Sequence, residues 1–124
     1  MHLYLTPMEV GDVTLVEASG RITLGQEVAA LRQVLEDLNA KGRRKIVLNL
    51  AGVSYIDSSG IAELVSGFTA AKRNGGTLKL LKLTKRVQDL LQITKLSTVF
   101  EIFDDESKAI ASFAGSEGAA TSAP

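Results

Sequence analysis

An almost unbroken apolar run at residues 45–50 (KIVLNL) lies between two stretches in which apolar residues recur every three or four positions. Apolar runs of this length are typical of a central strand that is covered on both faces. The flanking stretches, 26–40 and 61–71, predict amphipathic helices that each bury one face. Strands that alternate with helices form a mostly parallel sheet with crossover helices, so this pattern predicts an α/β fold.

Further strand and helix signals extend this pattern in both directions. Gly11 and Asp12 mark a turn between two strand-like segments, which predicts an N-terminal hairpin. Gly42 suits the end of the first helix, and Thr84 can cap a third helix. The other expected elements are strands at 3–8, 13–19, 77–83 and 99–103, a third helix that carries Val87, Leu90 and Leu91, and a last helix that carries Ala109, Ile110 and Phe113.

The length of 124 residues suits one domain with a single core. We therefore predict one α/β domain over residues 1–113, built on a mixed sheet of about four to five strands with an N-terminal hairpin and about four helices. Residues 114–124 are small and polar, and they offer too little apolar surface to order themselves. The sequence predicts a flexible tail there.

Composition narrows the classes of function. The chain has no cysteine and one histidine, so we expect no metal site, and no phosphate-binding glycine motif indicates a cofactor. The 14 basic residues balance the 14 acidic ones, which argues against nucleic acid as the main partner. The N-terminus lacks signal-peptide features and no apolar stretch is long enough to span a bilayer, so we expect a cytoplasmic protein without membrane insertion.

The turn at residues 57–60 (DSSG) is the strongest candidate for a functional site. Asp57 or a serine there can simply cap the following helix, because these side chains accept hydrogen bonds from unpaired N–H groups. The turn also follows the carboxyl end of a predicted parallel strand, where α/β sheets place their sites. A phosphate on Ser58 would be tolerated at a helix start and would make the surface beside Asp57 strongly anionic. Both interpretations are open at this point.

A catalytic role for Ser58 has little support in the sequence. A serine nucleophile needs a base to activate it, and the only histidine is His2 at the N-terminus. The chain also lacks a Gly-x-Ser-x-Gly motif. We therefore expect a protein that is not an enzyme and has no catalytic residue.

Residues 46–61, which contain the DSSG turn, resemble the central motif of STAS domains, the domains of sulfate transporters and anti-sigma-factor antagonists. Residues 75–80, 87–96 and 100–104 resemble later segments of the family and occur in the same order. The resemblance covers about residues 5–113. It implies the STAS fold, in which helices pack mainly on one side of the sheet.

The resemblance also implies a function for the turn. In anti-sigma-factor antagonists of this family, the serine after the motif aspartate is phosphorylated by a partner anti-sigma factor that is a serine kinase. The matching residue here is Ser58, and Asp57, Ser59 and Gly60 are its neighbours at the switch. The unphosphorylated antagonist binds the anti-sigma factor, the phosphorylated form releases it, and a phosphatase resets the cycle.

The family's partner surface implies contact roles for Thr23, Tyr55 and Ile61, and soluble antagonists often carry an acidic residue where this chain has Thr23. An alternative is a STAS scaffold subunit of a larger signalling or lipid-transport complex, in which Ser58 only caps a helix and no phosphorylation switch operates. A small-ligand or nucleotide-binding module is a third interpretation, ranked last because phosphate-binding loops are absent.

Overall fold

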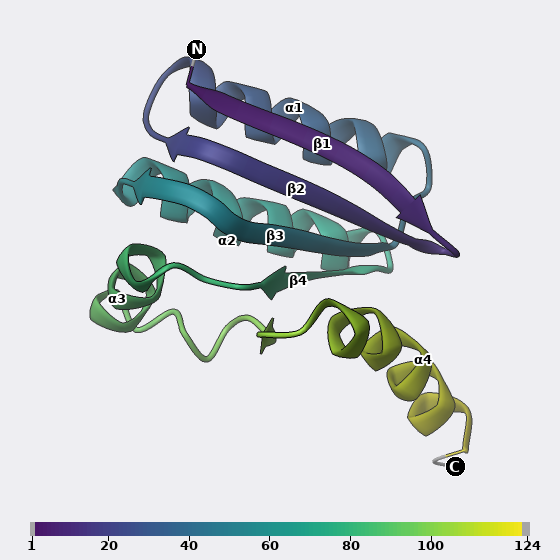
Figure 1. Ribbon diagram of the computed structural model, residues 1–124. Helices are drawn as coiled ribbons and strands as arrows, with labels where there is room; N and C mark the ends of the chain where they lie inside the picture. The colour runs from purple at the N-terminus through teal and green to yellow at the C-terminus, as the bar shows by residue number, and fades with distance from the viewer. Residues whose placement is uncertain (1, 123–124) are drawn as a thin grey trace.

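The computed structural model describes residues 2–122 and the side chains of residues 2–114. Within this range the chain forms one five-stranded sheet with strand order β1-β2-β3-β4-β5, and four helices pack against it (Figure 1). This architecture confirms the predicted α/β class, the mixed sheet and the N-terminal hairpin. The elements are β1 (Leu3–Val10), β2 (Val13–Ile22), α1 (Gln26–Ala40), β3 (Lys45–Ile56), α2 (Ser58–Arg73), β4 (Thr77–Leu81), α3 (Lys85–Ile93), β5 (Ile102–Phe103) and α4 (Glu106–Ser122).

The strand directions follow from the connections between the strands. β1 and β2 form an antiparallel hairpin in which Val10 pairs with Val13. β3, β4 and β5 each run parallel to the strand before them, and a helix lies in each crossover. The carboxyl ends of β2, β3 and β4 therefore lie at the same edge of the sheet, which is where α/β folds place their sites.

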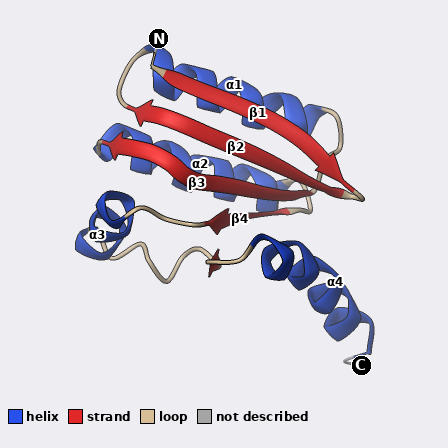
Figure 2. Ribbon diagram, in the orientation of Figure 1, coloured by secondary structure: helices blue, strands red, loops and turns tan. Residues whose placement is uncertain are grey.

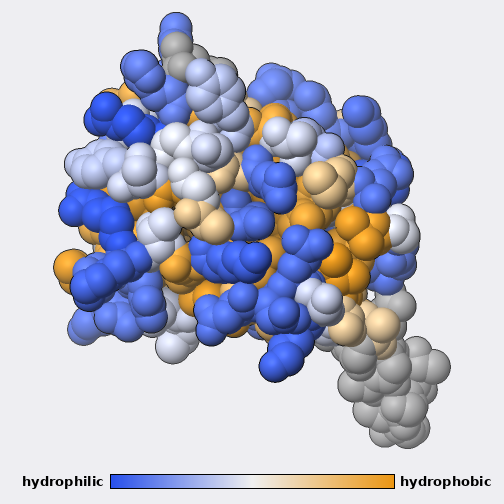
Figure 3. All heavy atoms as spheres, viewed as in Figure 1, coloured by the Kyte–Doolittle hydropathy of each residue, from blue (hydrophilic) through white to orange (hydrophobic). Residues whose placement is uncertain are grey.

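The helices divide unequally between the two faces of the sheet (Figure 2). α1, α2 and α3 contribute the fully buried Leu31, Leu64 and Leu91 to the larger core on one face. α4 contributes Phe113 to a smaller core on the other face, which includes Val47 of β3. Figure 3 views this second face, where hydrophobic atoms gather beside the start of α4. β3 is thus covered on both faces, as its apolar run predicts.

Lys79 of β4 is a buried cation on the face that α4 covers, with 2% of its surface exposed. Its Nζ donates a hydrogen bond to Ser112 Oγ over 2.8 Å and lies 3.3 Å from Glu101 Oε2. The same ammonium group lies 4.2 Å from the centroid of the Phe113 ring. A buried charge is costly unless it is paired, so the loss of these contacts would destabilise the protein. The contacts with Ser112 and Phe113 therefore hold the first turns of α4 against the sheet.

Local sequence signals set several helix ends as predicted. Gly42 follows the end of α1 with a φ of 78°, and the N–H groups of Gly42 and Arg43 donate to carbonyls of the last helical turn. A positive φ favours glycine, so this residue ends the helix at low cost. At the start of α3, Thr84 Oγ1 accepts a hydrogen bond from the Val87 N–H, which confirms the predicted cap.

The bounds of all five strands differ from the sequence prediction: β1 ends at Val10 instead of residue 8, and β2 ends at Ile22 instead of residue 19. β3 continues past residue 50 to Ile56, because β2 continues to Ile22 and stays paired with it through two register shifts within residues 17–21. β4 ends at Leu81 instead of residue 83. The strand expected at 99–103 is reduced to Ile102–Phe103, because residues 94–101 form the connection that leads out of α3.

Helix α4 extends past residue 113, where the sequence places the end of the domain, and continues to Ser122. The side chains of residues 115–122 and the whole of residues 123–124 lie outside the described part of the chain. The flexibility of residues 114–124 therefore stays a prediction.

We expect Phe113→Ala to lower the free energy of unfolding by about 3 kcal/mol, because a phenylalanine removed from a core loses its burial and leaves a cavity. Chemical denaturation of the full chain measures the loss. Lys108→Ala changes an exposed residue of the same helix and should alter the free energy of unfolding by less than about 0.5 kcal/mol. Equal effects of the two substitutions would contradict the packing of α4 on the sheet.

Candidate functional site

Asp57 lies between β3 and α2 and is the N-cap of α2. Its Oδ1 accepts the N–H of Gly60 at 2.9 Å, and its own N–H donates to the carbonyl of Ile22 at 3.2 Å. Its second carboxylate oxygen, Oδ2, accepts the N–H of Leu24 at 3.0 Å. One carboxylate therefore joins the start of α2 to the loop between β2 and α1.

The charge of Asp57 is stabilised by the backbone around it. Burial alone raises the pKa of this carboxyl, but the N–H groups of Leu24, Gly60 and Ser59 outweigh that effect and hold the pKa below its ordinary value. The carboxylate is therefore ionised at neutral pH. It lies at the positive end of the α2 dipole, which favours an anion.

Ser58 is the first residue of α2 and is exposed, whereas Ser59 is half-buried and Gly60 is buried. Among the residues whose side chains are described, none forms a hydrogen bond with the Ser58 hydroxyl. The structure thus places the DSSG turn at a strand-to-helix junction. Of its two serines, Ser58 is the one that presents its side chain to solvent.

Gly60 has a packing role beneath the turn. A Cβ at this position would lie 2.5 Å from the carbonyl oxygen of Ile22 and 2.5 Å from Cγ1 of Ile56. Any larger residue would push α2 away from the ends of β2 and β3. The absence of a side chain at the buried Gly60 therefore lets the first turn of α2, which carries Ser58, pack against the ends of β2 and β3.

Tyr55 lies near the carboxyl end of β3, two residues before the turn, and is 37% exposed. The guanidinium carbon of Arg86 lies 4.5 Å from the centroid of its ring, and that of Arg21 lies 5.5 Å from it. Arg21 is the β2 partner of Tyr55 in the sheet, and Arg86 comes from the first turn of α3. These cation–π contacts hold the ring and place two positive charges at the same end of the sheet as Ser58.

Thr23 and Ile61, the other residues predicted for the partner surface, have different environments. Thr23 is half-buried; its Oγ1 donates to Glu27 Oε1 at 3.4 Å, and its carbonyl accepts the N–H of Val28. Ile61 is 3% exposed and belongs to the core beneath α2. Its assignment to the surface is therefore corrected: helical spacing places Ile61 on the same inward face as Leu64.

Leu24 is a surface residue that the sequence analysis missed. It is 75% exposed, although its side chain is large and apolar. Asp57 holds its backbone N–H, so the side chain stays beside the DSSG turn. An isolated leucine between Thr23 and Gly25, in an otherwise polar loop, is the signal that points to it.

The described residues contain no group of three or more His, Cys, Asp or Glu side chains that could hold a metal ion. In the same part of the chain, no helix has the length and apolarity needed to cross a membrane. The backbone N–H of His2, the single histidine, donates a hydrogen bond to Glu27 Oε2 at 2.8 Å. What the turn presents to solvent is a hydroxyl beside an ionised carboxylate.

Residues 4–109 match the family model of the STAS domain. The chain belongs to the STAS domain family. Its sequence is similar to the anti-sigma-B factor antagonist of Staphylococcus epidermidis, with 28% identity over 102 residues that cover 82% of this chain and 94% of the relative. This alignment covers most of both chains, so the similarity to the antagonist extends over the whole domain and is not limited to one motif.

Solved structures share the STAS fold of this chain. An anti-sigma factor antagonist from Mycobacterium paratuberculosis aligns with a TM-score of 0.76 at 18% identity, over 89% of this chain and 92% of that chain. The Bacillus cell fate determinant SpoIIAA in its phosphorylated form aligns with a TM-score of 0.71 at 18% identity, over 89% of this chain and 99% of that chain. At these identities the comparison supports the fold.

We expect Asp57→Ala to lower the free energy of unfolding of this STAS domain by about 1 kcal/mol at neutral pH, because the N-cap is lost.

Asp57→Asn keeps an acceptor at the same place and removes the charge. The pKa of Asp57 in the folded state is lower than in the unfolded chain, so the charge of Asp57 stabilises the fold. This stabilisation is complete at a pH above the pKa of an unfolded aspartate, about 3.9. It is lost as the pH falls through the pKa of the folded state.

Chemical denaturation of the wild type and Asp57→Asn, from pH 7 down to the lowest pH at which the wild type stays folded, measures this effect. The wild type should be the more stable at pH 7, and the difference should shrink below about pH 4. A difference that stays constant over this range would show that the charge of Asp57 does not stabilise the fold.

Proposed function

We propose that this chain is an anti-sigma-factor antagonist that acts by partner switching. In its unphosphorylated form it binds an anti-sigma factor that is also a serine kinase, phosphorylation of Ser58 releases that partner, and a phosphatase restores the binding form. The observation that carries the proposal is the exposed Ser58 hydroxyl at the first position of α2, next to the ionised Asp57. The name of the Staphylococcus relative and the phosphorylated form of a structural neighbour support it.

The start of α2 suits a phosphate that a partner detects by its charge. The helix dipole and the backbone N–H groups favour an anion there, so the phosphoserine requires no change of fold. The phosphate adds about −1.5 to −2 charges beside the carboxylate of Asp57. A partner that had covered a neutral hydroxyl would then face two adjacent anions, at a cost of a few kcal/mol or about 100-fold in affinity.

The proposed partner surface draws on several elements at this end of the sheet. Thr23 and Leu24 lie in the loop after β2. Tyr55 lies on β3, and the two arginines that flank its ring are Arg21 of β2 and Arg86 of α3. Exposed apolar and aromatic side chains, with arginines beside them, are typical of the residues that dominate binding energy at interfaces. Because Asp57 holds both the Leu24 loop and the first turn of α2, the surface is organised before the partner arrives.

Incubation of the full chain with its anti-sigma factor, Mg²⁺ and ATP tests the proposed phosphorylation. We expect one phosphate on Ser58, identified by tandem mass spectrometry. Ser58→Ala should abolish the modification, while Ser59→Ala, the matched control one residue away, should leave it intact. A phosphate on another residue, or none, would overturn the assignment of Ser58.

Titration calorimetry with the same anti-sigma factor tests the effect of the charge. Ser58→Asp should weaken binding by about 100-fold, because it places a second anion beside Asp57. Ser58→Ala should bind like the wild type and stay bound in the presence of ATP. If Ser58→Asp binds the anti-sigma factor as tightly as the wild type, phosphorylation does not control binding and the proposed switch is wrong. A pull-down that recovers transporter subunits and no ATP-binding kinase would favour the scaffold alternative.

We also expect Leu24→Ala to weaken binding of the anti-sigma factor by about 10-fold, since an exposed leucine held beside Ser58 would be buried at the interface. The melting temperature should stay nearly constant, because 75% of the Leu24 side chain is already exposed. Val10→Ala is the control, since Val10 is a 37% exposed apolar residue at the hairpin end of the sheet. Equal affinities of Leu24→Ala and the wild type would exclude Leu24 from the interface.

A further inference from the structure

Two exposed arginines flank Tyr55 at the end of the sheet that carries Ser58. The guanidinium carbons of Arg86 and Arg21 lie 4.5 Å and 5.5 Å from the centroid of the Tyr55 ring. Within the described part of the chain, neither guanidinium group forms an ion pair or a hydrogen bond with another residue. The N–H donors of both side chains are therefore available to another molecule.

The acidic side chains at this end of the sheet are engaged by other groups. Asp57 accepts two backbone N–H groups, and Glu27 accepts a backbone N–H and a threonine hydroxyl. Asp89 lies 3.4 Å from the Nζ of Lys85 in the same helix. Asp57 is also half-buried and Glu27 is buried, whereas both arginines are exposed. The surface around Tyr55 therefore presents positive charge to solvent.

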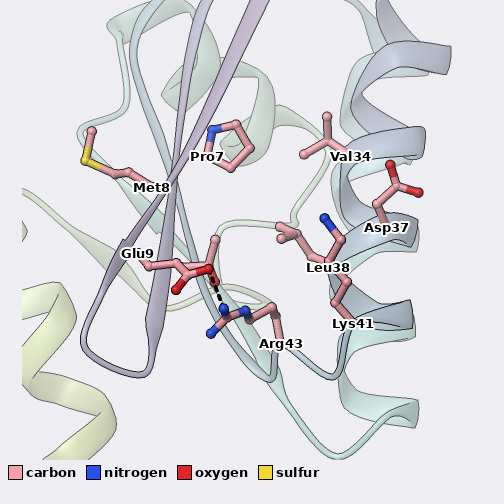
Figure 4. A pocket seen from close by; sticks show the side chains of 9 residues that line it. Pro7, Met8, Glu9, Val34, Asp37, Leu38, Lys41 and Arg43 are labelled. Carbon is pink, nitrogen blue, oxygen red and sulfur yellow. Dashed lines mark hydrogen bonds and ion pairs between the residues drawn. The ribbon is translucent and has the colours of Figure 1, made fainter.

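The position of Arg86 is unfavourable for the protein alone. Arg86 lies in the first turn of α3, where the positive end of the helix dipole disfavours a cation. Arginines at the other end of the sheet are stabilised within the chain. Figure 4 shows that Arg43 points towards Glu9, with which it forms an ion pair, and Arg73 lies in the last turn of α2, where the dipole favours a cation. Arg86 has neither kind of stabilisation, which points to an anion on another molecule.

We propose that Arg21 and Arg86 bind carboxylates of an acidic segment on the anti-sigma factor. This inference rests on the proposed function and adds the charge that the partner brings to the contact. A guanidinium group can donate two parallel hydrogen bonds to one carboxylate, so two arginines can hold two acidic side chains. The half-exposed Tyr55 ring between them would supply apolar contact area to the same segment.

An acidic contact at this place also explains why a phosphate on Ser58 would release the partner. Tyr55 and Ser58 are three residues apart, so their Cα atoms lie within about 11 Å of each other. This separation is close to the distance of about 8–10 Å over which charges interact in physiological salt. The phosphate would therefore repel the carboxylates that the arginines hold, in addition to the surface that covers Ser58.

The salt dependence of association, measured by stopped flow with the anti-sigma factor used above, tests the charge of this contact. Raising NaCl from about 50 mM to about 500 mM should slow association with the wild type by about 10-fold, because salt screens opposite charges. The double variant Arg21→Gln/Arg86→Gln should associate slowly at both salt concentrations. Arg73→Gln, the matched control, removes one exposed arginine at the far end of α2 and should behave like the wild type.

Single substitutions of Arg86 separate its charge from its packing on Tyr55. In titration calorimetry at low salt, Arg86→Lys should bind within about 3-fold of the wild type, Arg86→Gln about 10-fold more weakly and Arg86→Glu about 100-fold more weakly. The melting temperature of Arg86→Glu should not fall, because an anion suits the start of α3. Weaker binding would then reflect the contact and not the stability of the fold.

Two results would overturn this inference and leave the proposed function intact, provided that Ser58→Asp still weakens binding. One is an affinity of the double variant equal to that of the wild type. The other is equal weakening by Arg86→Gln and Arg86→Glu, which would show that Arg86 acts only by packing on Tyr55. If the wild type does not bind the anti-sigma factor, the proposed function and this inference are both wrong.

Discussion

The parallel pairing of β2 with β3 is the constraint on which the rest of this molecule depends. It places Arg21 beside Tyr55 and Ile22 beside Ile56, so both strands end at the same level. Asp57 then continues the ladder by one more hydrogen bond, from its N–H to the carbonyl of Ile22. The next residues can turn directly into α2, and the Asp57 carboxylate reaches both the new helix and the loop that leaves β2.

The same pairing explains why the surface around Ser58 is assembled from distant parts of the chain. Leu24 follows β2 and Tyr55 belongs to β3, and each is held by contacts that cross between elements. Helix α1 connects the two ends of the sheet, because it begins after the Leu24 loop and leads to the start of β3.

Much of the fold could be predicted because its signals are local. The spacing of apolar residues defined α1 over residues 26–40, and Gly42 and Thr84 marked helix ends. Strand ends were less predictable: β3 extends to Ile56 only because β2 continues beside it. Ile61 was misplaced on the surface because its contact role was taken from the family's partner surface, whereas the helical period turns its side chain towards the sheet.

The sequence by itself determined the α/β class, the position of the DSSG turn between a strand and a helix, and the resemblance to STAS domains. These features depend on residues that are neighbours along the chain, so periodicity, capping and motif order reveal them. The tertiary structure decided that Asp57 binds the N–H of Leu24 and that two arginines flank Tyr55. Each of these is a contact between segments far apart in sequence, such as the 33 positions between Leu24 and Asp57, and only the packing of the strands and helices brings them together.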